Sequence, residues 1–216
     1  MNSAAFHLPV WFDLGATFAF ALTGALAAIK RGYDIVGVFF LALATGLGGG
    51  LVRDGVFLPG RAATPLLTDP RYIYLVVAAT VAGALFGGHV KKFHRLIAVI
   101  DALGLGAYAA FGTEKALLAN LAAPAAVLVG VINAAGGGLM RDIITREEPL
   151  VFKPGQFYVL TALAGAVTFV FLTAKLETGP TRAALAAVAV TFVFRALTIT
   201  FNWRTTSVSE LTEPRA

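Results

Sequence analysis

The sequence predicts an all-α integral membrane protein with seven transmembrane helices, built from two inverted three-helix repeats and a seventh helix. Hydrophobic residues make up 58% of the chain and charged residues only 13%, whereas a soluble domain carries about 25% charged residues. Seven apolar stretches approach the ~20 residues with which a helix crosses a bilayer. A Gly-Gly-Gly-x-x-Arg-Asp motif also occurs twice, in the second and the fifth stretch.

The first three predicted helices cover Pro9–Ile29, Ile35–Phe57 and Tyr72–Val90. Proline suits the first turn of a helix, where its missing N–H costs nothing. The first stretch has no basic residues before it and is interrupted early by Asp13. We therefore expect it to remain in the protein as a membrane helix, rather than to be cleaved as a signal peptide. The connectors "KRGYD" and "PGRAATPLLTDPR" hold the charges and turn-forming residues that separate these helices.

The remaining predicted helices cover Leu96–Thr113, Leu121–Ile144, Phe157–Ala174 and Ala183–Phe201. The connectors before and between them are "KKFHR", "EKALLAN", "TREEPLVFKPG" and "KLETGPTR". No stretch between the helices is long enough for a soluble domain. We therefore expect residues 1–216 to form a single membrane domain.

The two halves of the chain match at a constant offset of 88 residues. The matched pairs are Asp13 with Asp101, Gly24 with Gly112, Gly48, Gly49 and Gly50 with Gly136, Gly137 and Gly138, Arg53 with Arg141, and Asp54 with Asp142. The first repeat covers about 9–90, the second about 96–174, and the extra helix about 183–201. Because each repeat contains an odd number of helices, the second enters from the opposite face of the membrane, which gives an inverted repeat.

The glycine runs predict a bend in the second and fifth helices. Each glycine weakens a helix by roughly 1 kcal/mol relative to alanine, and broken helices are tolerated in membranes only beside protein or a water-filled cavity. The bend would turn backbone carbonyls and the small polar residues Thr45 and Asn133 towards a central path, where they replace the hydration shell of a cation. The alternative is that the glycines let neighbouring helices pack closely.

The Arg-Asp pairs predict two ion pairs at opposite ends of the path. Asp13 and Arg53 lie about four residues from the same ends of their helices, so we expect them to pair near the outer face. The repeat predicts the mirror pair, Asp101 with Arg141, near the cytoplasmic face, with Asp54 and Asp142 beside the two pairs. Charges inside a membrane helix indicate function by default. They form either a gate or ion-attracting vestibule, or structural bridges between helices.

The composition also excludes several functions. The chain has no cysteine and only three histidines, so thiolate and histidine metal sites are not expected. The sequence shows no nucleophile–base pair, and we expect neither enzymatic activity nor a cofactor. Nucleic acid is not an expected partner, because the basic residues lie in short connectors rather than on one face. In those positions they face the headgroups of membrane lipids.

The distribution of Lys and Arg predicts the orientation. One side has nine of these residues and the other five. The nine are Lys30, Arg31, Lys91, Lys92, Arg95, Arg146, Lys153, Arg204 and Arg215, and the five are Arg61, Arg71, Lys115, Lys175 and Arg182. Because the side richer in Lys and Arg faces the cytoplasm, the N-terminus is predicted outside and the C-terminus inside. Arg195 lies inside the seventh helix, where it either snorkels to the interface or pairs with a carboxylate.

The motifs "GLGGGLVRD" and "AGGGLMRD", in helices two and five of a 3+3+1 arrangement, resemble the prokaryotic branch of the trimeric intracellular cation (TRIC) channel family. The same family is also described as glycine-transporter-like. The resemblance covers nearly all of the chain from Asp13 to Phe201. It implies a homotrimer in the cell (inner) membrane, with a pore in each subunit lined by helices two and five. It also implies permeation by monovalent cations, chiefly potassium, and no other metal.

Two other functions remain open at this stage. Inverted repeats and broken helices are also typical of secondary transporters, and opposed helix ends could hold a small zwitterion such as glycine. A membrane scaffold without transport is the third hypothesis. The absence of a titratable residue near the middle of the predicted helices favours a passive channel over a proton-driven carrier.

Overall fold

A computed structural model of the chain describes residues 8–58, 68–87, 94–153, 157–203 and 205. Its elements are α1 (Trp11–Lys30), α2 (Ile35–Val52), the π-helical turn η1 (Arg53–Phe57), α4 (Pro70–Phe86), α5 (His94–Leu118), α6 (Ala123–Ile144), α7 (Tyr158–Ala174) and α8 (Pro180–Thr200). No β-strand occurs among the described residues. The predicted all-α class with seven helices is confirmed.

The helices have the length and composition of membrane spans. Five segments of the described chain are long and apolar enough to cross a bilayer: α1, α2 continued by η1, α5 from Ile97, α6 and α8. The helices α4 and α7 have 17 residues each, at the short end of the range of about 17–25 for a span. The chain is therefore a multi-pass membrane protein.

The fourth predicted helix is too short. The sequence places Glu114 and Lys115 in a connector, but α5 continues to Leu118. Both charges have partners that allow the helix to continue: the Glu114 carboxylate accepts a hydrogen bond from the backbone N–H of Leu8 at 2.6 Å, and Lys115 pairs with Asp54. The predicted end of the third helix, 88–90, and most of the connector that follows helix two lie outside the described residues.

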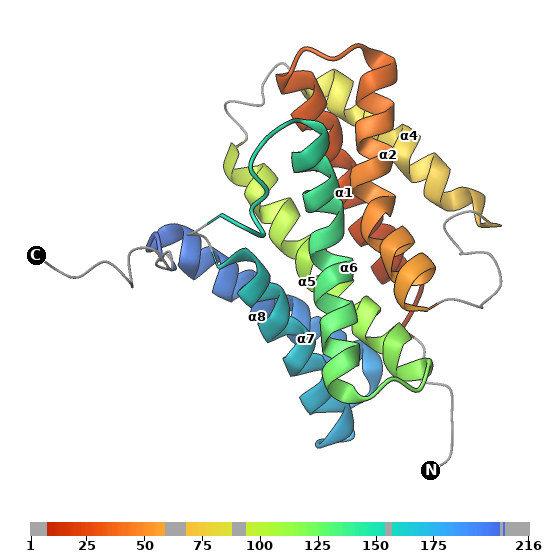
Figure 1. Ribbon diagram of the computed structural model, residues 1–216, viewed down its shortest axis with the longest axis vertical. Helices are drawn as coiled ribbons and strands as arrows, with labels where there is room; N and C mark the ends of the chain where they lie inside the picture. The colour runs from red at the N-terminus through yellow and green to blue at the C-terminus, as the bar shows by residue number, and fades with distance from the viewer. Residues whose placement is uncertain (1–7, 59–67, 88–93, 154–156, 204, 206–216) are drawn as a thin grey trace, which may run out of the picture.

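The helices form one bundle in which α1, α2, α5 and α6 are central (Figure 1). Helix α4 packs on α1 and α2 at one side of the bundle, and α7 packs on α5 and α6 at the other. Helix α8 covers α5 and α7. The two halves meet where α2 packs on α6 and α1 packs on α5. Each half thus contributes its first two helices to the centre and its third helix to the periphery.

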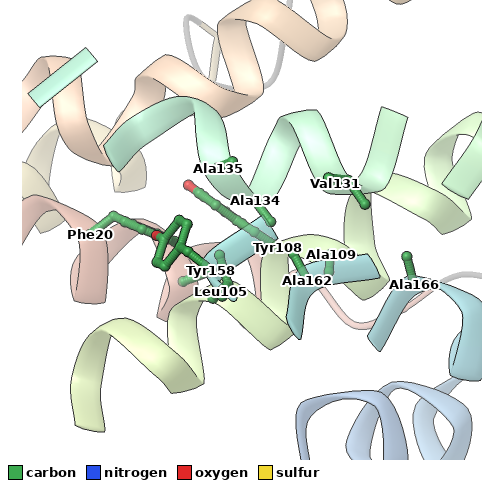
Figure 2. Close-up of a cluster of buried hydrophobic side chains, with 11 residues drawn as sticks. Phe20, Leu105, Tyr108, Ala109, Val131, Ala134, Ala135, Tyr158, Ala162 and Ala166 are labelled. Carbon is green, nitrogen blue, oxygen red and sulfur yellow. The ribbon is translucent and has the colours of Figure 1, made fainter. Parts of the chain in front are cut away.

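Two aromatic residues that match at the repeat offset meet in the core. The rings of Phe20 and Tyr108 stack with centroids 5.3 Å apart, and both side chains are fully buried. They belong to a buried cluster to which α5, α6 and α7 also contribute alanines (Figure 2). The Tyr108 hydroxyl donates to the Gly46 carbonyl at 2.6 Å and lies 2.7 Å from Thr17 Oγ1. The contact joins α1 to α5 across the two halves.

The glycine runs form the contact between α2 and α6. A methyl group added at Gly49 would overlap the carbonyl oxygen of Asn133, and one added at Gly137 would overlap the carbonyl oxygen of Thr45. As the chain advances from Thr45 to Gly49 in α2, its partner in α6 moves back from Gly137 to Asn133. The two helices are therefore antiparallel at this crossing, as an inverted repeat requires. Only glycine allows backbones to approach this closely.

The glycines do not break either helix. The α-helical pattern continues through 48–50 in α2 and through 136–138 in α6. The departure from α-helical geometry comes just after the first run, in η1, which begins at Arg53. Close helix packing, the alternative that the sequence left open, is therefore the role visible in the structure. A change of axis direction along α2 or α6 stays a prediction.

The variants Gly49→Ala and Gly137→Ala are each expected to destabilise the protein by roughly 1–3 kcal/mol, because the added methyl group overpacks the α2–α6 crossing. Thermal unfolding in detergent measures this effect. The matched control is Gly15→Ala in α1, where no atom lies within 4 Å of the added methyl group. Alanine there is expected to be neutral or to stabilise by up to ~1 kcal/mol. Equal effects at Gly15 and Gly49 would contradict this account of the crossing.

Candidate functional site

Arg53 is the centre of a first charged cluster, which contains Asp13, Arg53, Asp54, Tyr72 and Lys115. Its side chain is fully buried. The guanidinium binds the neighbouring Asp54 carboxylate through two hydrogen bonds, Nε to Oδ1 at 2.6 Å and Nη2 to Oδ2 at 2.9 Å. Its Nη1 lies 4.0 Å from Asp13 Oδ1. The predicted pairing of Asp13 with Arg53 is thus present, but Asp54 is the closer partner.

Asn133 of α6 connects this cluster to the other half of the chain. Its Oδ1 accepts from Arg53 Nη1 at 3.2 Å, and its Nδ2 donates to the Tyr108 carbonyl at 2.7 Å. The Phe111 ring lies 5.4 Å from the Arg53 guanidinium carbon, a distance suited to a cation–π contact. A buried arginine is tolerated when it is both paired and hydrogen-bonded, and residues from α1, η1, α5 and α6 supply those partners here.

Tyr72 and Lys115 complete the first cluster. The Tyr72 hydroxyl donates to Asp13 Oδ2 at 2.5 Å, so α4 holds the carboxylate of α1 in place. Lys115 Nζ lies 3.7 Å from Asp54 Oδ2 and 5.2 Å from the centre of the Phe111 ring. The cluster therefore contains two cations and two carboxylates, which balance in charge.

A second charged cluster contains Asp101, Arg141, Asp142, Tyr158 and Arg195. Arg141 donates from Nε to Asp142 Oδ1 at 2.9 Å, and its Nη1 lies 3.8 Å from Asp101 Oδ1. The predicted mirror pair is therefore present. Thr23 Oγ1 lies 3.4 Å from the same nitrogen. The Arg141 side chain is 14% exposed, whereas Arg53 is fully buried, so the two clusters are not equivalent.

Helix α8 adds Arg195 to the second cluster. Arg195 is buried, and its guanidinium lies 5.0 Å from the centre of the Tyr158 ring. It is close enough to Asp101 for Coulombic attraction. Of the two interpretations of Arg195 from the sequence, this burial favours a bridge to a carboxylate over snorkelling to the interface. Both clusters thus contain two aspartates, one repeat arginine, one further cation and one tyrosine.

The clusters lie at opposite ends of the α2–α6 crossing. Arg53 follows Gly49 by four residues and Arg141 follows Gly137 by four residues. Because α2 and α6 are antiparallel, these steps lead in opposite directions. The contact of Arg53 with Asn133 fits this arrangement. The geometry thus places one charged cluster on each side of the glycine contact.

Several residues that the sequence predicts to line the path contact other parts of the protein instead. The Thr45 hydroxyl donates to the Leu41 carbonyl of its own helix at 2.6 Å, and Asn133 is occupied by Arg53 and Tyr108. Gly48 faces the Met140 side chain and Gly136 faces the Cα atom of Gly49. Gly138 faces the Tyr158 hydroxyl, and Gly50 is buried in α2.

The sequence did not predict three members of the clusters: Tyr72, Lys115 and Tyr158. Lys115 has no repeat partner and sits beyond the predicted end of its helix. The tyrosines occur near the start of the third helix of each repeat, but 86 residues apart rather than 88. Because of this difference of two residues, a comparison at the constant offset of 88 does not match the two tyrosines.

Seven apolar helices around buried, charge-balanced clusters define a polytopic helical membrane protein. The family model described as glycine transporter matches the chain twice, over residues 10–88 and 98–174. The chain belongs to this family, and the resemblance to TRIC channels is confirmed by the relatives and solved structures described next.

Relatives of known sequence are membrane proteins. The UPF0126 membrane protein of Deinococcus radiodurans is 32% identical over 157 residues, which is 72% of either chain. The inner membrane protein YadS of Escherichia coli K12 is 29% identical over 161 residues, 74% of this chain and 76% of YadS.

Solved structures of similar fold are cation channels. The TRIC trimeric intracellular cation channel orthologue of Rhodobacter sphaeroides superposes with a TM-score of 0.82 at 31% identity, over 89% of this chain and 97% of the orthologue. A second TRIC cation channel superposes with a TM-score of 0.82 at 29% identity, over 97% of this chain and all of the other.

The glutamine variant Arg53→Gln is expected to destabilise the protein by roughly 3–5 kcal/mol, because it removes the buried cation that pairs with the buried Asp13 and the half-buried Asp54. Thermal unfolding in detergent measures the loss, and Asp54→Asn in the same chain is expected to restore part of it.

The control is Arg31→Gln, which removes the exposed ion pair of Arg31 with Glu147 at 2.7 Å. This change is expected to cost less than about 1 kcal/mol. Similar losses for Arg53 and Arg31 would show that the first cluster does not depend on its buried arginine.

Proposed function

We propose that this protein is a monovalent cation channel that prefers potassium, with a conduction path inside each subunit beside the α2–α6 crossing. The observation that carries the proposal is the likeness to a TRIC cation channel over 97% of this chain. The family resemblance is shared by both halves of the chain, so the likeness is not confined to one helix pair.

The two charged clusters are proposed as the gates of this path. Arg53 and Arg141 each hold two aspartates, and a cation passing either cluster requires the guanidinium to move aside. The released carboxylates Asp13 with Asp54, and Asp101 with Asp142, would then face the cation. A path lined by one sign of charge concentrates counter-ions. In this proposal the structure is closed at the first cluster, where Arg53 is fully buried.

The glycine runs are proposed to expose backbone oxygen to the path. At the crossing, Gly49 lies against the Asn133 carbonyl oxygen and Gly137 lies against the Thr45 carbonyl oxygen. Backbone carbonyls can replace the hydration shell of a monovalent cation. A bend of α2 and α6 at 48–50 and 136–138 would increase that exposure, and Thr45 and Asn133 would add polar oxygens if they exchanged their present partners.

The assembly is proposed to be a homotrimer in the cell (inner) membrane, surrounded by lipid, with the N-terminus outside and the C-terminus in the cytoplasm. The trimer is supported by the description of the Rhodobacter sphaeroides orthologue as a trimeric channel. The orientation is supported by the distribution of Lys and Arg. The channel requires no enzymatic activity and no cofactor.

A second candidate function is a secondary transporter of a small zwitterion such as glycine. Two observations favour it: the family model is described as glycine transporter, and antiparallel helices from inverted repeats are typical of transporters. A carrier moves substrate in saturable steps, whereas a channel passes discrete unitary currents in salt alone.

Single-channel recording of the purified protein in planar bilayers, under a potassium gradient without organic solute, decides between the two. We expect discrete unitary currents that reverse near the potassium equilibrium potential. The control is protein-free bilayers fused with the same detergent and lipid. A silent bilayer containing folded, inserted protein would contradict the channel, and saturable glycine uptake into proteoliposomes would then support the carrier.

A further inference from the structure

Met140 fills the place where the first glycine run lacks a side chain. A methyl group added at Gly48 would meet Sδ, Cγ and Cε of Met140. Side chains of an α-helix point back towards its N-terminus, so Met140 of α6 reaches from its own turn back to the α2–α6 crossing. The contact joins the two halves of the chain, and it places the sulfur atom next to the Gly48 backbone.

The second glycine run has no such cover. At the offset of 88, Gly136 is the repeat partner of Gly48, and Val52 is the repeat partner of Met140. Among the described residues, a methyl group added at Gly136 would meet only backbone atoms of Gly49 within 4 Å. Valine is branched and shorter than methionine. A long apolar side chain therefore covers a glycine in one half of the chain only.

Met140 also combines reactivity with access. The sequence contains two methionines, Met1 and Met140, and no cysteine, so Met140 holds the only sulfur atom in the part of the chain that the structure describes. The residue is partly exposed, whereas Gly48 is buried. Oxidation converts the methionine thioether into a sulfoxide, a polar group that disrupts apolar packing. Met140 is thus a reactive group placed at the contact between the halves.

We propose that Met140 is a redox-sensitive plug of the α2–α6 crossing, and that oxidation of its sulfur by a peroxide unseats the side chain from Gly48. A lone pair of Sδ attacks one peroxide oxygen, and the O–O bond breaks as the S–O bond forms. The hydroxide that leaves takes the proton of the transferred oxygen and becomes water. Sulfur is oxidised, and the peroxide is reduced, by the same electron pair. The effect on ion flow rests on the proposed conduction path, whereas the oxidation itself does not.

The sulfoxide is a poor replacement for the thioether at this place. Its oxygen is a hydrogen-bond acceptor, whereas the face of Gly48 that Met140 covers presents a Cα atom. A buried polar group without a hydrogen bond is costly, so the oxidised side chain is expected to turn away and leave Gly48 uncovered. The gap lies beside the crossing, where close packing holds α2 and α6 together.

The first arm of the test measures the melting temperature in detergent before and after treatment with hydrogen peroxide. Peptide mass spectrometry identifies which methionine has gained an oxygen atom. The melting temperature of the oxidised protein is expected to fall by roughly 2–12 °C, because a polar group replaces a packed thioether. Methionine sulfoxide reductases are expected to restore it. An unchanged melting temperature after oxidation of Met140, or oxidation of Met1 alone, would overturn the proposal.

Two variants separate Met140 from other effects of peroxide. Met140→Leu preserves an apolar side chain of similar volume and retains Met1, so its melting temperature is expected to change little and to become insensitive to peroxide. In the same background, Leu128→Met places a methionine elsewhere on α6, where the leucine is 55% exposed. That methionine is expected to be oxidised without a fall in melting temperature. An equal fall in this variant would contradict a role for the site beside Gly48.

The second arm measures single-channel currents in planar bilayers. Oxidation uncovers Gly48 in the proposed path, and the open probability is expected to rise about fivefold or more. The Met140→Leu protein is expected not to respond to peroxide. Unitary currents whose open probability is unchanged by oxidation would overturn the plug. A silent bilayer together with the expected melting temperatures would defeat the proposed channel and leave the oxidation site in place.

Discussion

The structure depends on the contact of glycine with backbone carbonyl where α2 crosses α6. Gly49 lies against the Asn133 carbonyl and Gly137 against the Thr45 carbonyl, so no side chain separates the two backbones. Lipid tails are as apolar as leucine, and helices in a bilayer therefore associate through close packing rather than through the hydrophobic effect. The crossing fixes the two halves relative to each other. It also places Arg53 and Arg141 at opposite ends of one interface, where each meets partners from other helices.

The buried charges are tolerated because each cluster is neutral and assembled from several helices. Arg53 and Asp54 neutralise each other within one turn of the same helix, as do Arg141 and Asp142. The first helix of each half then adds a second carboxylate, and α5 or α8 adds a second cation. Desolvation of an unpaired charge would cost several kcal/mol. In the proposed channel, a cation that displaces either arginine would meet the two carboxylates that the arginine now contacts.

The repeat is closely symmetric in sequence, but the structure is not symmetric at its two clusters. Arg53 has no exposed surface and accepts support from Asn133, whereas Arg141 is partly exposed and contacts Thr23 instead. The matched residues Thr45 and Asn133 differ in the same way: the asparagine hydrogen-bonds to Arg53, while the threonine hydroxyl donates to a carbonyl of its own helix.

The sequence by itself determined the membrane fold, the seven helices, the repeat and the pairing of Asp13 with Arg53 and Asp101 with Arg141. Hydropathy and a constant offset are local properties, so they can be read from the chain without knowledge of its packing. Only the tertiary structure decided that the glycines join two helices without breaking either one, because helicity at a glycine depends on what the facing backbone offers. It also decided the contacts of Lys115, Tyr72, Tyr158 and Arg195. Their partners lie on other helices, and side-chain reach across an interface leaves no periodic signal in the sequence.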